Sequence, residues 1–286
     1  MAKQTSKSND LLATLRNNPI WSPPLDAAIA EVRAGRDDFE DYVKLTFAGR
    51  KRKHGIVVGA PGTGKSYGVA QIARNLGLRE GTIDDQGRYD FTVIKGSVSP
   101  SFLHVLLYWH RKPGKVLVFD DCKTIEHDTE ALTAINSVAD TTNPVVTRAS
   151  MKEMVGIPNQ FKFEGRILII SNTFSPERAN TRRNSVREHR IGSITDRIRP
   201  FPVGNDDHQT IMAHLIDLAA TERIFANEMA ADDDTVAEVI LWMVENLHKF
   251  KTLSIRHMMD IMDYRLDPQV RNWQRMAARV CTKSYD

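Results

Sequence analysis

The spacing of hydrophobic residues divides the chain into an alternating part and a helical part. Between residues 54 and 170, short apolar runs alternate with segments in which apolar residues recur every three or four positions. The short runs predict strands and the longer segments predict amphipathic helices. The expected strands are 54–58, 91–96, 115–119 and 166–170, and the expected helices are 65–76, 101–109 and 129–139. This alternation predicts an α/β fold in which helices cover both faces of a parallel sheet.

The two ends of the chain have different patterns. Residues 1–20 are rich in Ser, Lys, Asn and Asp, which predicts a flexible N-terminal tail. The patterns at 25–34 and 39–47 predict two short helices. A strand-like segment at 200–203 is followed by helical patterns alone, at 207–220, 235–249, 254–264 and 268–280. We therefore expect an α/β core at 21–204 and a helical domain at 205–286.

Composition narrows the class of protein. The 286 residues are 41% apolar and 26% charged, with a net charge of +3, as in ordinary globular proteins. That charge is too small to indicate a nucleic-acid or membrane partner. The longest apolar run, Val239–Val244, is far shorter than the roughly 20 residues of a membrane span. With no secretory signal pattern, these features predict a cytoplasmic protein, in which Cys122 and Cys281 are free thiols.

A glycine-rich loop carries the clearest chemical signal. The segment Gly59–Ser66 reads GAPGTGKS, and it follows an expected strand and precedes an expected helix. In such a loop the glycines let backbone N–H groups face a phosphate, the lysine reaches the outer phosphates, and the serine hydroxyl binds Mg²⁺. The expected contacts to ATP and Mg²⁺ are Gly59, Gly62, Thr63, Gly64, Lys65 and Ser66.

A second signal is an apolar strand that ends in two carboxylates, Asp120 and Asp121. We expect Asp120 to hold Mg²⁺ together with Ser66, and Asp121 to orient and deprotonate the attacking water. The second acid of such a pair is usually glutamate. The shorter Asp121 therefore leaves open a shifted strand end, slow hydrolysis, or help from Glu126 or Glu130.

The strand 166–170 is followed by Ser171 and Asn172. The phosphate loop, the acidic strand, this strand and a helical C-terminal part, in that order, resemble an AAA+ ATPase over residues 50 to 285. The resemblance implies a parallel αβα P-loop NTPase core with a C-terminal helical lid domain. It also implies that the Asn172 strand lies between the other two strands and that Asn172, as sensor 1, contacts the γ-phosphate or the attacking water.

Arginines are concentrated between residues 178 and 199. The resemblance implies that Arg197 is the arginine finger that completes the site of a neighbouring subunit, with Arg199 as the second choice. A solvated loop, or a patch that contacts nucleic-acid phosphates, remains an alternative. The resemblance further implies that Arg256, at the start of an expected helix, is the sensor 2 residue that contacts the bound nucleotide.

The segment 140–165 reads as an insertion whose pieces 145–148 and 160–163 would pair as a hairpin. Arg148, Lys152, Phe161 and Lys162 are its candidate contacts to a polymer, and an ordinary surface hairpin is the alternative. Residues 158–165 are similar to small phage-encoded AAA+ proteins. No histidine or cysteine spacing predicts a zinc site.

These observations predict an ATP hydrolase that assembles into a ring, implied to be hexameric, and remodels or translocates a polymer. The resemblance favours DNA in replication or recombination, and a protein substrate is the other option. The alternative function is an ATP-controlled binding switch, similar to a helicase loader, with slow turnover. A small-molecule kinase fits less well, because the helical domain and the arginine segment have no role in it.

Overall fold

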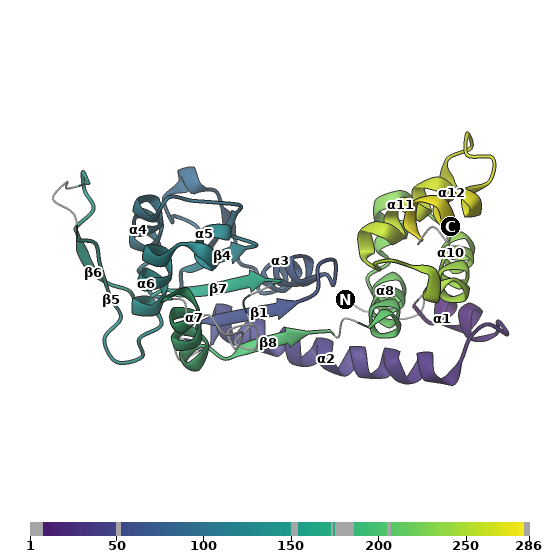
Figure 1. Ribbon diagram of the computed structural model, residues 1–286, viewed down its shortest axis with the longest axis horizontal. Helices are drawn as coiled ribbons and strands as arrows, with labels where there is room; N and C mark the ends of the chain where they lie inside the picture. Colours follow the sequence, from purple (N-terminus) through teal and green to yellow (C-terminus); the bar gives the residue numbers. More distant parts are fainter. Residues whose placement is uncertain are drawn as a thin grey trace. The chain divides into compact units, whose positions relative to one another are not determined.

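The computed structural model describes residues 8–49, 53–149, 154–172, 174, 186–204 and 207–282 (Figure 1). The contacts between residues divide the chain into two compact units. The sheet unit comprises Asp38–Gly59 and Lys65–Val203, and the helical unit comprises Met1–Asp37, Ala60–Gly64 and Gly204–Asp286. This division differs from the linear boundaries 1–20, 21–204 and 205–286, because the N-terminal segment and five residues of the glycine-rich loop group with the C-terminal helices.

The sheet unit contains a six-stranded, fully parallel sheet with the order β2-β3-β4-β7-β1-β8. Its strands are β1 (Gly55–Gly59), β2 (Glu80–Gly81), β3 (Phe91–Lys95), β4 (Val116–Asp120), β7 (Arg166–Ser171) and β8 (Pro200–Val203). The central strands β4 and β7 are apolar along almost their whole length and are buried. This is the pattern of strands that are covered on both faces, and it confirms the predicted α/β class.

Alternation along the strands forms two apolar layers. In β4, Leu117 and Phe119 belong to the core on one face, together with residues from α4 (Pro100–Trp109), α5 (Lys123–His127), α6 (Thr129–Val138) and α7 (Val186–Arg197). Val116 and Val118 belong to the core on the other face, together with residues from α3 (Lys65–Asn75) and the C-terminal part of α2 (Pro23–Ala48). The unit is therefore a three-layer αβα arrangement, with β7 between β1 and β4, which is the order that the family resemblance implies.

Two helices of the sheet unit begin at a capping side chain, α4 at Ser99 and α6 at Asp128. Ser99 accepts a hydrogen bond from the Phe102 N–H, and Asp128 accepts hydrogen bonds from the N–H groups of Glu130 and Ala131. The helices are α3 (Lys65–Asn75), α4 (Pro100–Trp109), α5 (Lys123–His127), α6 (Thr129–Val138) and α7 (Val186–Arg197), with a 3-10 turn η1 at Ile83–Asp85.

The expected hairpin is present as β5 (Val145–Thr147) and β6 (Gln160–Lys162), which pair antiparallel. Phe161 differs from its expected role, because its ring is only 8% exposed and packs against Tyr108 at 5.3 Å between ring centroids. A buried ring is not available to stack on a base. Lys162 is exposed and pairs with Glu164, while Lys152 lies outside the described residues.

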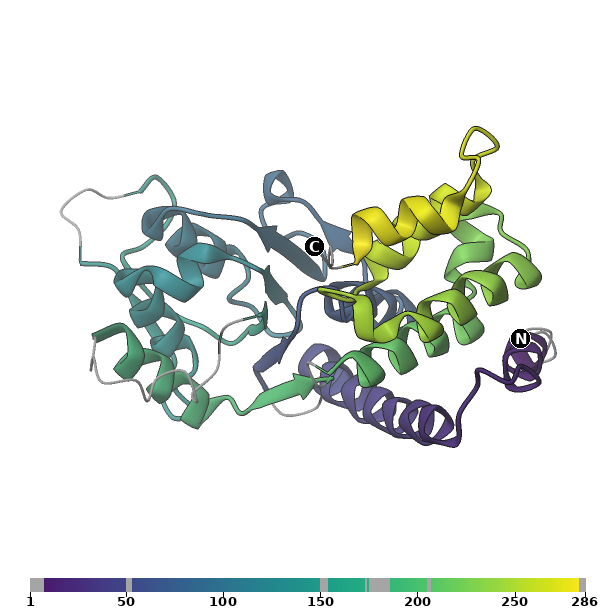
Figure 2. The same ribbon diagram turned by 45° about the vertical axis from the view of Figure 1, so that its right-hand side comes forward.

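In the helical unit, an apolar core is enclosed by short helices (Figure 2). They are α8 (His208–Thr221), α9 (Ile224–Met229), α10 (Asp233–Glu245), α11 (Ile255–Leu266) and α12 (Trp273–Cys281), with a 3-10 turn η3 at Leu247–Lys249. Asp207, Asp232, Ser254 and Asn272 cap the starts of four of them. The last helix starts later than the predicted 268, because Asp267 first closes a turn through the N–H groups of Gln269 and Val270.

The N-terminal prediction needs two corrections. Residues that were expected in a flexible tail form α1 (Ser8–Arg16), whose Leu11, Leu12 and Leu15 are buried and which packs against α8 and α10. The two short helices expected at 25–34 and 39–47 are one helix, α2 (Pro23–Ala48). The polar interval 35–38 separates the two apolar patterns without interrupting the helix. Its one glycine, Gly35, costs a helix only about 1 kcal/mol, and Arg36 is held by side chains of α8.

Candidate functional site

The glycine-rich loop leaves the carboxyl end of β1 and leads into α3. Gly62 and Gly64 have φ angles of 78° and 77°, which side-chain-bearing residues rarely adopt. At Gly59, an added Cβ would lie 2.3 Å from the Val203 carbonyl oxygen of β8. The backbone therefore favours glycine at Gly59 and Gly64, the two positions that the phosphate-loop pattern specifies, and also at Gly62, which the pattern leaves open.

Lys65, the first residue of α3, turns its side chain back toward the strand ends. Its ammonium group donates to the Gly59 carbonyl at 2.8 Å and to the Asn172 side-chain oxygen at 2.9 Å, and the residue is 6% exposed. An ammonium group buried to this extent needs such partners. Lys65 thereby connects the end of β1 with the residue that follows β7.

Asp120 is the last residue of β4 and is 6% exposed. Its Oδ1 accepts a hydrogen bond from the Ser66 hydroxyl at 2.6 Å, and its Oδ2 forms an ion pair with Lys95 at 3.2 Å. Lys95 ends β3 and is directly opposite Asp120 in the strand register. The carboxylate that the sequence assigns to Mg²⁺ is thus next to the hydroxyl that is assigned to the same ion.

Asp121 follows in an unusual backbone conformation, with φ at 48°. Its N–H donates to the Ile170 carbonyl of β7 at 2.9 Å, and its Oδ1 accepts a hydrogen bond from the Asn172 amide at 3.1 Å. Aspartate tolerates this left-handed region better than most residues. The turn keeps Asp121 exposed at the end of the sheet, beside Asn172.

Of the two alternative acids, Glu126 is buried and accepts a hydrogen bond from the hydroxyl of Ser171, the last residue of β7. The same hydroxyl accepts the N–H of Phe174 at 2.9 Å. Glu130 lies exposed in the first turn of α6. Glu126 therefore supports the end of β7 through Ser171.

Strand order explains why these residues meet. Because β7 lies between β1 and β4, the carboxyl ends of all three strands are adjacent, with Val58 opposite Ser171 and Asp120 opposite Ile170. Ligands of parallel α/β sheets bind at this edge. The structure brings together Gly59, Lys65, Ser66, Asp120, Asp121 and Asn172, which we call the strand-end cluster.

The chemistry of the strand-end cluster fits a Mg²⁺-phosphate ligand. Ser66 and Asp120 supply one hydroxyl and one carboxylate, and Mg²⁺ in phosphate-binding sites takes one or two protein ligands, completing its shell with water and phosphate oxygens. Lys65 supplies a positive charge beside them. Within the described ranges, no three His, Cys, Asp or Glu side chains are grouped as they would be in an all-protein metal site.

The arginine candidates make other contacts. Arg197 ends α7, and its guanidinium donates to the side-chain oxygen of Asn136 at 2.6 Å and to the Asn136 carbonyl at 3.0 Å. Arg199 is exposed, and its carbonyl accepts the Tyr42 hydroxyl. Residues 178–183 lie outside the described residues. The finger role of Arg197 stays a prediction.

The central residues of the loop contact side chains of the helical unit. An added Cβ on Gly62 would lie 2.3 Å from the Cβ of Ser254, and one on Gly64 would lie 3.3 Å from Nε2 of His214. Burial lowers the pKa of His214, so its ring is neutral at pH 7. Arg256 is exposed on α11, two residues after Ser254, and its expected contact with nucleotide stays a prediction.

Sequence reasoning missed Lys95, Ser254 and His214. Lys95 is recognisable afterwards as the polar residue at the carboxyl end of the strand beside β4. Ser254 is a helix cap, which is a local role that does not predict a contact with Gly62. His214 is one of nine scattered histidines, and its proximity to the loop depends on how α8 packs.

Comparison with protein-family models and with curated protein sequences found no match to this chain. Along the described part of the chain, no helix combines the length and the apolar character needed to cross a bilayer.

Proposed function

We propose that this protein binds ATP with Mg²⁺ at the strand-end cluster and hydrolyses it, as an ATPase similar to the AAA+ class. One observation carries the proposal: side chains from three segments that are distant in sequence are hydrogen-bonded at the carboxyl ends of β1, β4 and β7. Lys65 donates to Asn172, Asn172 donates to Asp121, and Ser66 donates to Asp120. The strand order, with β7 between β1 and β4, is the order that the family resemblance implies and supports the same proposal.

Each member of the cluster has a distinct role in this reaction. Lys65 and the loop N–H groups bind and neutralise the phosphates, and Ser66 and Asp120 hold Mg²⁺, which bridges phosphate oxygens and offsets their charge. Asp121 accepts the proton of the attacking water, and Asn172 orients that water. Hydrolysis then depends mainly on position and charge, which polar groups that are already hydrogen-bonded to one another supply in advance.

A second candidate function, an ATP-controlled binding switch, is favoured by the geometry of Asp121. This carboxylate is one methylene shorter than glutamate and is already hydrogen-bonded to Asn172 at 3.1 Å. A general base must come within about 2.6–3.2 Å of the group that it deprotonates, directly or through one water. A short carboxylate that already accepts a hydrogen bond from Asn172 is less able to deprotonate water, so ATP would be hydrolysed slowly. Bound ATP would then control assembly for longer.

The wider setting of the proposal rests on the resemblance alone. A homo-oligomeric ring, a hexamer by analogy, would place Arg197 of one copy at the site of the next. DNA is the first candidate substrate and a protein the second, in the cytoplasm. Fold-level analogy warrants little by itself, so the first experiment addresses the site.

The test compares ATP binding in the intact chain, in Lys65→Ala and in Lys44→Ala. Lys44 is an exposed lysine of α2 that pairs with Glu40, and it serves as the matched control. Removing Lys65 should weaken ATP binding at least about 100-fold, since a buried charge contact to phosphate is lost. Lys44→Ala should bind as the intact chain does. Equal affinity in all three proteins, measured by calorimetry, would refute the phosphate-loop assignment.

Steady-state hydrolysis then separates the two functions. The rate is measured against protein concentration, with and without single- and double-stranded DNA, at two salt concentrations. An ATPase that acts on a polymer should turn over continuously and faster with DNA. A switch should bind ATP and assemble, with a slow rate that ignores DNA.

A further inference from the structure

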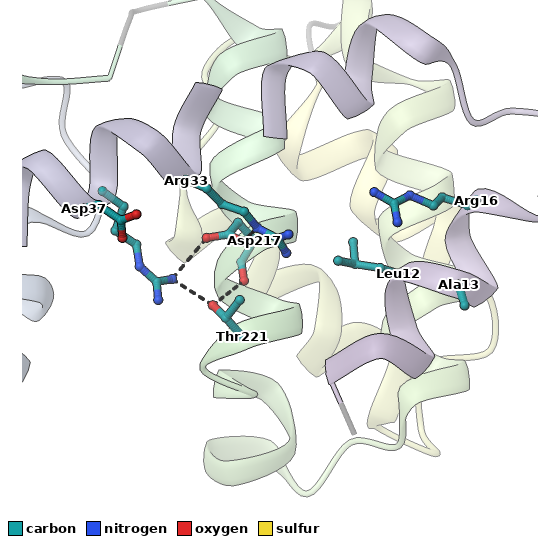
Figure 3. Close-up of a pocket in the computed structure, with 8 residues that line it drawn as sticks. Leu12, Ala13, Arg16, Arg33, Asp37, Asp217 and Thr221 are labelled. Carbon is teal, nitrogen blue, oxygen red and sulfur yellow. Dashed lines mark hydrogen bonds and ion pairs between the residues drawn. The ribbon is translucent and has the colours of Figure 1, made fainter. Parts of the chain in front are cut away.

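A second polar pocket lies wholly within the helical unit. Its cavity volume is about 620 Å³, within the range of about 300–1,000 Å³ for small-molecule sites. It lies between α1, α2 and α8, and Leu12 and Ala13 contribute apolar wall (Figure 3). Its charged lining consists of Arg16, Arg33, Arg36, Asp37 and Asp217.

One wall of this pocket is fixed by a buried carboxylate. The side chain of Asp217 on α8 is only 1% exposed and accepts Nε of Arg33 at 2.6 Å and an Nη of Arg36 at 3.1 Å. A buried carboxylate is costly unless it is paired in this way. The Arg36 guanidinium has two further partners, the Thr221 hydroxyl and the Glu222 carboxylate. Arg36 therefore serves to hold α2 against α8.

Arg33 and Arg16 differ from Arg36, because each is held through its Nε and not through its terminal nitrogens. Arg33 gives Asp217 only its Nε, and Arg16, on α1, gives only its Nε to Asp26 at 2.8 Å. Within the described part of the chain, the terminal nitrogens of both guanidiniums have no acceptor. The side chain of Arg16 is 50% exposed and that of Arg33 is 43% exposed. Figure 3 shows the two side chains extending toward each other from different walls of the pocket.

We propose that this pocket binds a phosphate group, held between the terminal N–H forks of Arg16 and Arg33. A guanidinium that is fixed through Nε presents its two terminal nitrogens in the planar geometry that matches two phosphate oxygens. Because the carboxylates already orient both arginines, little side-chain freedom is lost when the anion binds. The phosphate could come from a small molecule or from a nucleic-acid backbone, and both present the same oxygens.

The test uses pyrophosphate and a short single-stranded oligonucleotide as probes. All variants are made in the Lys65→Ala protein, because the loss of Lys65 weakens phosphate binding at the strand-end cluster. In this background, Arg16→Gln and Arg33→Lys are compared with Arg265→Gln, which alters an exposed, ion-paired arginine of the same unit. Arg33→Lys keeps a cation beside Asp217 but removes the fork, and unchanged thermal unfolding shows that the variants are folded.

We expect each fork variant to weaken binding of at least one probe about tenfold or more, as for the loss of one charge-assisted contact, and Arg265→Gln to leave it unchanged. Stronger binding of pyrophosphate identifies a small molecule as the source of the phosphate, and stronger binding of the oligonucleotide identifies a nucleic-acid backbone. If neither probe binds, if the fork variants bind normally, or if Arg265→Gln weakens binding equally, the proposal is wrong.

Discussion

At the scale of single residues, Asp121 combines an uncommon backbone conformation with a proposed catalytic role. Its φ of 48° lies in the left-handed region, where non-glycine residues are uncommon and often mark functional sites. The conformation lets its N–H reach Ile170 while its carboxylate meets Asn172. The backbone turn, rather than side-chain length, therefore places this acid.

Asp121→Asn tests that role with little backbone disturbance, since asparagine also tolerates the left-handed region. ATP affinity should stay within a few-fold of the intact protein, while hydrolysis should fall about 10²- to 10⁴-fold, the usual contribution of a general base. Single-turnover hydrolysis and equilibrium binding are measured on the same samples. Full hydrolysis by the variant would exclude Asp121 as the base.

Buried histidines make stability depend on pH. The ring of His110 is almost fully buried, between the Leu106 carbonyl and the Thr92 hydroxyl, and burial lowers its pKa below the ordinary value. Burial likewise lowers the pKa values of His104 and His214. In the unfolded chain these rings take up protons near pH 6.5, so below that pH the unfolded state binds more protons and stability falls.

Urea unfolding at pH 7.5 and pH 5.5 measures this effect. The intact chain should be less stable at pH 5.5, and His110→Gln should lose less between the two pH values. The difference should reach up to about 1.4 kcal/mol, which corresponds to one proton over one pH unit below 6.5. A loss in His110→Gln as large as that of the intact chain would show that His110 does not contribute.

Between elements, the glycine-rich loop and the start of α11 are in contact at Gly62. The Ser254 N-cap both begins α11 and packs onto Gly62, and the Ile255 N–H is 3.4 Å from the Gly62 carbonyl. Gly64 has the same left-handed backbone but more space, because the nearest atom to an added Cβ lies at 3.3 Å. Both glycines would therefore suffer backbone strain as alanine, but only Gly62 would also overlap severely with a neighbouring atom.

Gly62→Ala should therefore destabilise the protein more than Gly64→Ala. Both variants incur backbone strain of about 1–2 kcal/mol, and Gly62→Ala adds an overlap with Ser254. Adding Ser254→Gly should restore part of the stability lost in Gly62→Ala and none of that lost in Gly64→Ala. Equal unfolding free energies for the two alanine variants would contradict this contact.

For the whole molecule, the open question is whether one chain suffices for hydrolysis. Arg197, the proposed finger, is bound to Asn136 on α6 within its own chain. If it acts on a neighbouring copy, that hydrogen bond must be exchanged for contacts with bound phosphate. Activity would then require association, and it would rise with protein concentration.

Mixing experiments test this arrangement. Arg197→Ala and Lys65→Ala should each hydrolyse poorly, and their mixture should regain activity, because mixed assemblies contain sites with an intact Lys65 facing an intact Arg197. Arg275→Ala, which changes an exposed arginine of α12, is the control and should keep full activity. Assemblies that form but regain nothing would exclude a finger supplied by another copy.

The sequence alone determined the α/β class, most strands, the hairpin and the turn at the glycine-rich loop. These follow from short-range rules: continuous apolar runs such as 116–119 and 167–170 form buried strands, and glycines occupy positions where φ is positive. Prediction from the sequence failed where contacts with residues distant in the chain decide the local structure. Residues 8–16 are helical because Leu11 and Leu15 pack on other helices, and α2 continues through 35–38, where Arg36 reaches Asp217.

Only the tertiary structure decided which polar residues meet. Strand order placed Asn172 beside Lys65 and Asp121, and strand register placed Lys95 beside Asp120. The packing of the elements also buries Phe161, brings Arg197 to Asn136, and brings Arg33 and Arg36 to Asp217. Such contacts link residues that are far apart in sequence, so they depend on how the elements pack and no local pattern encodes them.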